Sequence, residues 1–230
     1  HTKKERDKTG QFIVEGNHLI QEALQAQCLK QLFILEGMKN PFSFEAIQCT
    51  QPVINKLSSQ VSDTKMIGIC TRPERAERKI DTALFLDDIQ DPGNIGTIFR
   101  CAVAFGIDHI FLSEHCADIL NPKSIQASKG ALFHMNYSYG SLHQAIKQEH
   151  NKGMMIFAAM LHTDSIALQD MQKVEHYGVI LGNEGQGIHP EIMVLADQCV
   201  EIEMDNFESL NVATAAAILL YTIKHKKRIQ

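Results

Sequence analysis

Three glycines and two polar side chains follow an apolar run in the C-terminal third of the chain. The run Tyr177–Leu181 stops at the sequence Gly-Asn-Glu-Gly-Gln-Gly, residues 182–187. Glycine lacks a Cβ atom and allows positive φ, so this backbone can approach a ligand closely. Asn183 and Glu184 add an amide and a carboxylate at the same place. Such a loop after a buried strand is a candidate binding site in an α/β protein, and the alternative is an ordinary strand-to-helix turn.

Two further stretches carry side chains that could do chemistry. Residues 87–100 read Asp-Asp-Ile-Gln-Asp-Pro-Gly-Asn-Ile-Gly-Thr-Ile-Phe-Arg, which predicts a strand end, a turn and a helix with Asn94 in its first turn and Arg100 in its second. A helix N-terminus after a glycine turn suits an anion or a polar ligand. In the second stretch, residues 208–221, Ser209 is the expected N-cap and Asn211 lies in the first turn. Each stretch alone also fits a capped structural helix.

Apolar runs alternate with helical patterns after residue 80, which predicts an α/β fold. Helices are expected near residues 94–105, 122–132, 141–150, 190–196 and 209–225, and strands at Ala83–Leu86, His109–Leu112, Met154–Ala158, Gly178–Leu181 and Cys199–Met204. Near-continuous apolar strands between helices indicate a parallel sheet covered on both faces. Ligands bind at the carboxyl ends of such strands, where residues 87–88, 182–184 and 205–206 all lie.

The first 72 residues predict a smaller α/β unit. A short apolar run at Phe12–Val14 precedes a helix that Gly16 or Asn17 would cap and that extends to about Gln27. Strands are expected at Leu32–Leu35 and Met66–Cys70, and a second helix after Pro52 with Val53, Ile54 and Leu57 inward. The charged, proline-marked residues 73–80 have the composition of a linker. We therefore expect domains at 1–72 and 81–230, joined by a linker at 73–80.

Composition narrows the class of protein. The 230 residues are 44% hydrophobic and 21% charged, which is ordinary for a globular protein, and no apolar run reaches the roughly 18 residues that span a bilayer. The N-terminus has no signal-like apolar segment, so we expect a cytoplasmic protein without membrane contact. The six cysteines form no C-x-x-C pair and H-E-x-x-H is absent, so neither a disulfide framework nor a metal site is expected.

The formal net charge of −5 is not that of a generally basic nucleic-acid binder. Basic residues nevertheless gather in three clusters: Lys3, Lys4, Arg6 and Lys8; Arg72, Arg75, Arg78 and Lys79; and Lys224, Lys226, Lys227 and Arg228. Each cluster also has a structural interpretation, as a solvated face, a linker or the C-terminal end of a helix. Any RNA would therefore be held by local basic patches rather than by the electrostatic field of the protein as a whole.

Taken in order, the three stretches resemble the three motifs of the SpoU (TrmH-like) branch of the SPOUT RNA methyltransferases. The resemblance covers about residues 82–224, and the sequence Ala-Ser-Lys-Gly-Ala-Leu-Phe at 127–133 is similar to a further family segment. Residues 1–71 resemble the ribosomal-protein-like substrate-binding domain that often precedes this catalytic domain, mainly through Phe-Ile-Val-Glu-Gly-Asn-His-Leu at 12–19.

The resemblance implies methyl transfer from S-adenosylmethionine to a ribose 2′-hydroxyl of RNA, with ribosomal RNA favoured over transfer RNA. It also implies a C-terminal trefoil knot and a homodimer through the catalytic domain, with the alanine-rich helix 209–221 at the interface. Matched by position, the cofactor-binding residues are Leu181, Gly182, Asn183, Gly187, Ile202, Met204 and Leu210.

The matched catalytic residues are Asn94, Arg100, Glu184, Ser209 and Asn211. Transfer from a sulfonium requires alignment of the 2′-oxygen behind the methyl group and removal of its proton. Arginine stays protonated in water, so Arg100 is expected to position a phosphate and to stabilise the developing alkoxide. Asn94 and Asn211 are expected to hold the ribose and nearby loops. Glu184 would orient Arg100 or the substrate, and Ser209 would hydrogen-bond within the site or cap its helix.

One segment departs from the family pattern. Residues 202–204 read Ile-Glu-Met where the family usually has Ile-Pro-Met, and the loop 205–208 lacks the usual glycine and is one residue short. Two other classes of protein remain open. One is a catalytically silent RNA-binding protein of the same fold. The other is a dinucleotide-binding enzyme, since Glu201 and Glu203 follow the glycine loop by about 20 residues, although the loop lacks the G-x-G-x-x-G order.

Overall fold

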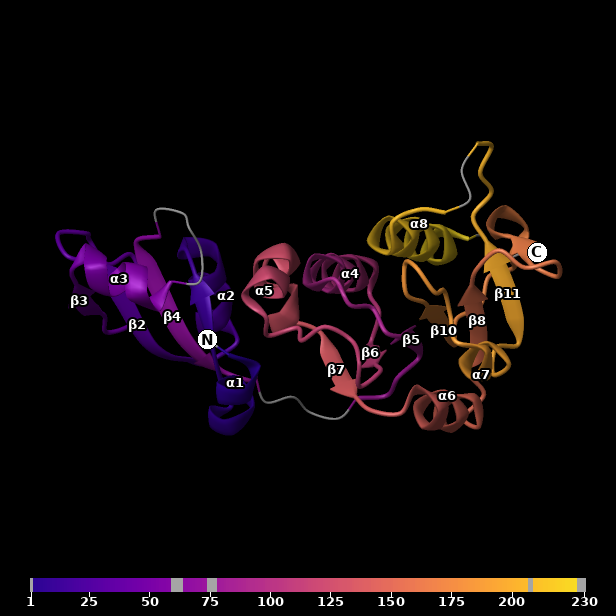
Figure 1. The fold of residues 1–230 in the computed structure, drawn as a ribbon, viewed down its shortest axis with the longest axis horizontal. Helices are drawn as coiled ribbons and strands as arrows, with labels where there is room; N and C mark the ends of the chain where they lie inside the picture. The colour runs from indigo at the N-terminus through magenta and orange to yellow at the C-terminus, as the bar shows by residue number, and fades with distance from the viewer. Residues whose placement is uncertain (1, 59–63, 74–77, 207–208, 227–230) are drawn as a thin grey trace.

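The computed structural model describes residues 2–58, 64–73, 78–206 and 209–226. Two sheets form, one before residue 72 and one after residue 81 (Figure 1). Several predictions lie outside the described residues: Arg75 and the middle of the linker 73–80, the loop positions 207 and 208, and the basic residues Lys227 and Arg228.

The N-terminal sheet has four strands in the order β1-β4-β2-β3, with bounds β1 Gln11–Glu15, β4 Met66–Thr71, β2 Leu29–Leu35 and β3 Ile47–Cys49. Strand β4 is antiparallel to β1 and to β2, and β3 is parallel to β2. Helix α2 (Asn17–Gln25) buries Leu19, Ile20 and Ala23, as its spacing predicts. Helix α3 (Gln51–Leu57) buries Ile54. The inward position predicted for Val53 is wrong, because the two-turn helix contacts the sheet through Ile54 and leaves Val53 44% exposed.

Helix α1 (Lys3–Thr9) was not predicted, because it has no apolar stripe. A capping box starts it: the Thr2 hydroxyl accepts from the Glu5 amide at 3.3 Å, and the Glu5 carboxylate accepts from the Thr2 amide at 3.3 Å. The solvated position predicted for this basic cluster is wrong for Arg6. That side chain is buried and donates to Asp118 through Nε at 3.1 Å and Nη2 at 2.8 Å.

The large sheet confirms the predicted parallel architecture. Its order is β7-β6-β5-β10-β8-β11-β9 and every neighbouring pair is parallel. The bounds are β5 Thr82–Leu86, β6 His109–Leu112, β7 Asn136–Tyr139, β8 Met155–Ala159, β9 Ile166–Ala167, β10 Tyr177–Leu181 and β11 Gln198–Glu201. Central strand β10 is buried at every residue. The edge strands β7 and β9 were missed because they are half-exposed or only two residues long.

Helices cover both faces of this sheet (Figure 1). Helices α4 (Pro92–Phe105), α5 (Pro122–Ser128) and α8 (Val212–His225) lie on one face, and α6 (Leu142–His150) and α7 (Pro190–Met193) lie on the other. Short 3₁₀ turns span Ala131–Phe133 and Leu168–Asp170. The single helix predicted at 122–132 is wrong, because Lys129 and Gly130 have positive φ and end α5.

Side chains from both sheets join in one hydrophobic core. Phe12 packs against Phe133 with ring centroids 6.1 Å apart, and the Gln126 amide donates to the Glu15 carbonyl at 3.2 Å. With the Arg6–Asp118 pair, these contacts attach the N-terminal sheet to the α5 region. The trefoil knot stays a prediction.

All six cysteines are free thiols. Within the described ranges, no group of three or more His, Cys, Asp or Glu side chains could hold a metal ion, and no helix is long and apolar enough to cross a membrane.

Candidate active site

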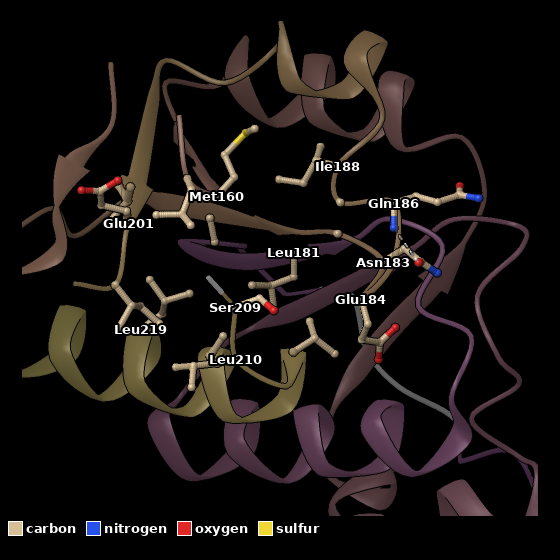
Figure 2. Close-up of a pocket in the computed structure, with 18 of the residues that line it drawn as sticks. Met160, Leu181, Asn183, Glu184, Gln186, Ile188, Glu201, Ser209, Leu210 and Leu219 are labelled. Atoms are coloured by element: carbon tan, nitrogen blue, oxygen red, sulfur yellow. Dashed lines mark hydrogen bonds between the residues drawn. The ribbon is translucent and has the colours of Figure 1, made fainter. Parts of the chain in front are cut away.

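A cavity of about 340 Å³ opens at the carboxyl ends of β8, β10 and β11, beside α8 (Figure 2). Its size lies at the lower end of the range for small-molecule sites. It is lined by Ala159, Met160, Leu161, Leu181, Gly182, Asn183, Glu184, Gln186, Gly187, Ile188, Val200, Glu201, Ile202, Met204, Ser209, Leu210, Val212, Ala215 and Leu219. The position follows the rule for parallel sheets, in which loops after the strands form the binding site.

The glycine loop closes on itself beside this cavity. Asn183 and Gly187 exchange backbone hydrogen bonds of 3.0 and 2.9 Å. The Asn183 side chain accepts from the amides of Gly185 and Gln186, and donates to the Asp88 carbonyl at 2.9 Å. A Cβ at Gly182 would lie 2.3 Å from the Gly187 carbonyl carbon, and Gly187 has φ +74°. Two of the three glycines are therefore required by the backbone path itself.

A buried carboxylate anchors the returning end of the loop. Asp87, 3% exposed at the end of β5, accepts from the His189 amide at 2.8 Å and pairs with its ring Nδ1 at 3.0 Å. The hydrogen bond to Asp87 raises the pKa of His189. Sequence reasoning placed Asp87 at a strand end but missed His189, which lies 102 residues away. No local pattern signals such a pair.

Three motifs meet in one chain of side-chain hydrogen bonds. The Asn211 amide donates to the Asn94 carbonyl oxygen at 3.0 Å, and the Asn94 amide donates to the Glu184 carboxylate. Asn211 and Asn94 are 117 positions apart in the sequence, and Asn94 and Glu184 are 90 positions apart. The structure therefore brings together the start of α4, the glycine loop and the start of α8, and places Asn94 in the middle.

The capping of α8 differs from the prediction. Asn211, not Ser209, is the N-cap: its side-chain oxygen accepts from the amides of Ala213 at 3.0 Å and Thr214 at 3.3 Å. The helix begins only at Val212, so the first-turn position predicted for Asn211 is also wrong. An N-cap side chain accepts from amides two or three residues further on, and only Asn211 lies at that distance from the amides of Ala213 and Thr214. Ser209 lies earlier and lines the cavity.

Asp91 caps the other helix of the site. Its carboxylate accepts from the Asn94 backbone amide at 2.9 Å. The hydrogen bond from the Lys123 amine, at 2.6 Å, lowers the pKa of Asp91 and keeps it an acceptor. The backbone of Asn94 is thus held by Asp91, while its side chain is held by Glu184 and Asn211.

Arg100 lies apart from this group. It is exposed in the third turn of α4, not the second, and does not line the cavity. Six residues of helix separate it from Asn94, about 9 Å along the axis. In the described part of the chain, no side chain forms a hydrogen bond or ion pair with its guanidinium group, and Glu184 contacts Asn94 instead. The interpretation that Glu184 orients Arg100 is therefore not supported within one chain.

All residues expected to bind the cofactor line the cavity, together with Glu184 and Ser209. Sequence reasoning missed the end of β8 at residues 159–161 and the α8 face formed by Val212, Ala215 and Leu219. The helical spacing of that face was a usable signal. Glu203, which replaces the family proline, is exposed between the two lining residues Ile202 and Met204.

The lining suits S-adenosylmethionine. Apolar side chains such as Leu181, Ile188 and Leu210 offer packing surface for a purine (Figure 2). Carboxylates of Glu184 and Glu201 lie near opposite ends of the view, and no Lys, Arg or His is among the described lining residues. A cationic sulfonium gains from such surroundings.

The parallel sheet and the carboxyl-edge cavity define an α/β domain that binds a small ligand. Residues 81–221 match the model of the SpoU rRNA Methylase family, and residues 1–68 match the MRM3-like substrate binding domain. The chain belongs to the SpoU rRNA methylase family.

Similar proteins agree with this membership. The 23S rRNA (guanosine(2553)-2′-O)-methyltransferase RlmP of Bacillus subtilis is 31% identical over 97% of this chain and 92% of its own length. A structure described as an RNA methyltransferase of the TrmH family from Porphyromonas gingivalis has a TM-score of 0.83 and 29% identity, covering 96% of this chain and 92% of that one. The SpoU methyltransferase AviRb from Streptomyces viridochromogenes, solved with AdoMet, shares the fold at a TM-score of 0.84 and 22% identity, over 97% and 93% of the two chains.

Proposed function

We propose that the chain transfers a methyl group from S-adenosylmethionine to a ribose 2′-hydroxyl of ribosomal RNA. The observation that carries the proposal is the convergence of Asn94, Glu184 and Asn211 beside an apolar cavity that has no basic lining residue in the described chain. The relative RlmP, which is similar over nearly its whole length, is named as a 23S rRNA 2′-O-methyltransferase. Action in the cytoplasm is part of the same proposal.

The mechanism is alignment without a covalent enzyme intermediate. S-adenosylmethionine, when bound, supplies the electrophilic methyl group. Leu181, Ile202 and Leu210 would enclose it against the glycine loop. The Asn94–Asn211 pair would orient the ribose, because amides can donate to and accept from its hydroxyls. Orientation of this kind contributes much of the acceleration expected for a direct transfer.

The proposed role of Arg100 requires a second copy of the chain. Helix α8 exposes Ile218 (37%) and Tyr221 (56%), and α4 packs beside α8. Apolar side chains on an exposed helix face suit a symmetric interface. A homodimer built on this face would set Arg100 near the cavity of the partner, where it can hold an RNA phosphate. Its role as the residue that stabilises the alkoxide depends on this assembly.

The glycine loop speaks against the dinucleotide-binding alternative. A dinucleotide fingerprint opens directly into a helix whose N-terminus holds the pyrophosphate. Here the loop closes through the Asn183–Gly187 bridge and only the four-residue α7 follows it. Titration with nicotinamide cofactors should therefore show no binding at concentrations that saturate with S-adenosylmethionine.

The test is incubation of RNA from cells that lack this protein with the enzyme and labelled S-adenosylmethionine, followed by mapping of 2′-O-methyl sites. We expect one labelled position in large-subunit ribosomal RNA. Label in transfer RNA alone would contradict the proposed ribosomal substrate. Binding of S-adenosylmethionine without methyl transfer to any RNA would favour a catalytically silent RNA-binding protein.

Arg100→Ala should reduce transfer at least about 100-fold, as removal of a charge-stabilising donor does. Affinity for S-adenosylmethionine, measured by calorimetry, should stay unchanged, because Arg100 does not line the cavity of its own chain and is proposed to hold an RNA phosphate at that of the partner. Arg100→Lys is the matched control and should keep part of the activity. Unchanged turnover in Arg100→Ala would remove Arg100 from the mechanism.

A further inference from the structure

A second cavity, of about 540 Å³, lies at the opposite edge of the large sheet. It is lined by Arg72, Pro73, Arg78, Ile80, His109, Phe111, Asn136, Tyr137, Gln148, Glu149 and Lys152. The register pairs Ala83, His109 and Asn136, so the cavity lies where β5, β6 and β7 begin. The cofactor cavity lies at the other ends of the strands, about 15 Å away along the strand direction at 3.3 Å per residue.

The lining carries an excess of positive charge. Three cations, Arg72, Arg78 and Lys152, face one carboxylate, Glu149, so the formal charge is +2 in a chain of −5. Glu149 is 2% exposed and pairs with Lys152 at 2.8 Å. Arg72 forms a long ion pair with Asp7 at 3.9 Å, and in the described ranges no carboxylate pairs with Arg78. Both guanidinium groups are exposed, so Arg78, and Arg72 beside its long contact with Asp7, can bind an anion.

Aromatic rings lie beside these cations. Phe111 stacks on the buried Phe85 with centroids 5.0 Å apart and an interplanar angle of 8°, and His109 lies 4.3 Å from Phe111. The His109 ring is also bound to the Ser138 hydroxyl at 3.0 Å. Tyr137 pairs with Ile110 rather than with His109 or Phe111, so its ring lies on the other face of the sheet, edge-on against Phe99 at 5.4 Å. His109 and Phe111 are part-exposed and are held by the core, so they can contact a base with little loss of side-chain entropy.

Aromatic surface next to exposed cations is the chemistry of single-stranded RNA binding, in which bases stack and phosphates pair with Arg or Lys. We propose that this cavity is a second RNA contact, which binds an unpaired nucleotide of the substrate away from the methylated one. The inference rests on the proposed function for the identity of the RNA. Arg72 directly follows β4, so the contact lies where the N-terminal domain passes into the catalytic domain.

The test compares the unmodified chain with the double variant Arg72→Gln/Arg78→Gln. Loss of two phosphate contacts should weaken binding of single-stranded substrate RNA about tenfold at 0.1 M salt and lower the slope of log affinity against log salt by about 1.4. KM for RNA should rise while kcat at saturating RNA and affinity for S-adenosylmethionine stay unchanged. Lys147→Gln/Lys173→Gln is the matched control, since it removes the same charge from two exposed lysines outside the cavity.

RNA that carries 4-thiouridine should also crosslink to residues 109–111 or 136–137 on irradiation. Equal affinity and equal salt slope for the two double variants would overturn the inference, as would crosslinks confined to other segments. Saturable binding of a free nucleotide at this cavity without competition by RNA would also overturn it. Failure of the proposed function looks different: no RNA would be methylated by the unmodified chain, whereas the difference in RNA affinity between the two double variants would persist.

Discussion

The two edges of the large sheet differ in charge and in shape. The carboxyl edge holds an apolar cavity closed by a glycine loop, with two carboxylates and no basic side chain among the described lining residues. The amino edge holds a larger cavity with three cations beside aromatic rings. One sheet can thus keep a cationic methyl donor and a polyanionic RNA strand on surfaces of opposite charge.

Helix direction helps to explain the difference. In a parallel sheet, helices start at the carboxyl edge and end at the amino edge, where their carbonyl groups carry partial negative charge. Helix α6 ends at His150, two residues before Lys152. The starts of α4 and α8 at the carboxyl edge are instead filled by their own caps, Asp91 and Asn211. Cations are therefore favoured at one edge and hydrogen-bonding polar groups at the other.

Gly182→Ala should produce the largest effect at the carboxyl edge. The new Cβ would lie 2.3 Å from backbone carbon, which cannot move aside without opening the loop. We expect affinity for S-adenosylmethionine to fall by about 100-fold or more, since displaced backbone costs a few kcal/mol. RNA affinity should remain. Gly185→Ala is the matched control, because its Cβ meets only Asn183 Oδ1 at an ordinary 3.5 Å. Equal donor affinity in the two variants, measured by calorimetry, would contradict the assigned role of the loop.

Asn211 has two roles that two substitutions can separate. Asn211→Ala removes the cap of α8 and should lower the free energy of unfolding by about 1 kcal/mol, together with the rate of transfer. Asn211→Asp keeps an acceptor for the amides of Ala213 and Thr214 but loses the donor to Asn94. It should keep stability and still lose about tenfold or more in kcat. Urea unfolding and single-turnover kinetics measure the two effects, and full activity in Asn211→Asp would limit Asn211 to capping.

Glu201→Gln tests whether charge matters at the carboxyl edge. Glu201 lines the cavity and is part-buried, so its carboxylate should favour the sulfonium over the neutral thioether product. We expect affinity for S-adenosylmethionine to fall about fivefold, roughly 1 kcal/mol, and affinity for S-adenosylhomocysteine to stay the same. Glu203→Gln, one position outside the lining, is the control. An equal loss for both ligands would mean that Glu201 acts through shape rather than charge.

The smallest expected effect concerns the pH dependence of stability. The pKa of His189 is raised above its ordinary 6.5 by Asp87, so its contribution is fully present below that value and is lost as pH rises through the raised pKa. The stability difference between the unmodified chain and His189→Gln should therefore shrink from pH 6 to pH 8. Chemical unfolding across this range measures it. A difference that does not change with pH would show that the charge of the ring does not contribute and that the backbone bond to Asp87 anchors the loop.

The sequence patterns that correctly predicted elements of the catalytic domain were runs of apolar residues, which indicate that a strand is buried. Strand β10 is apolar at every position because it is covered on both faces, and the breaks at Gly182 and Gly187 follow from a backbone path that needs glycine. The same reasoning missed α1, whose only buried residue is Arg6, and placed the start of α8 too early. A helix held by an ion pair has no apolar period to detect.

The sequence by itself determined the α/β class, the glycine loop and part of the set of residues that line the cavity at the strand ends. Only the tertiary structure decided which side chains meet: Asp87 with His189, Asn94 between Glu184 and Asn211, and Arg6 with Asp118. These pairs are about 90 to 117 residues apart along the chain. Periodicity reports which side of an element is buried, whereas such contacts depend on strand order and on how helices cross the sheet.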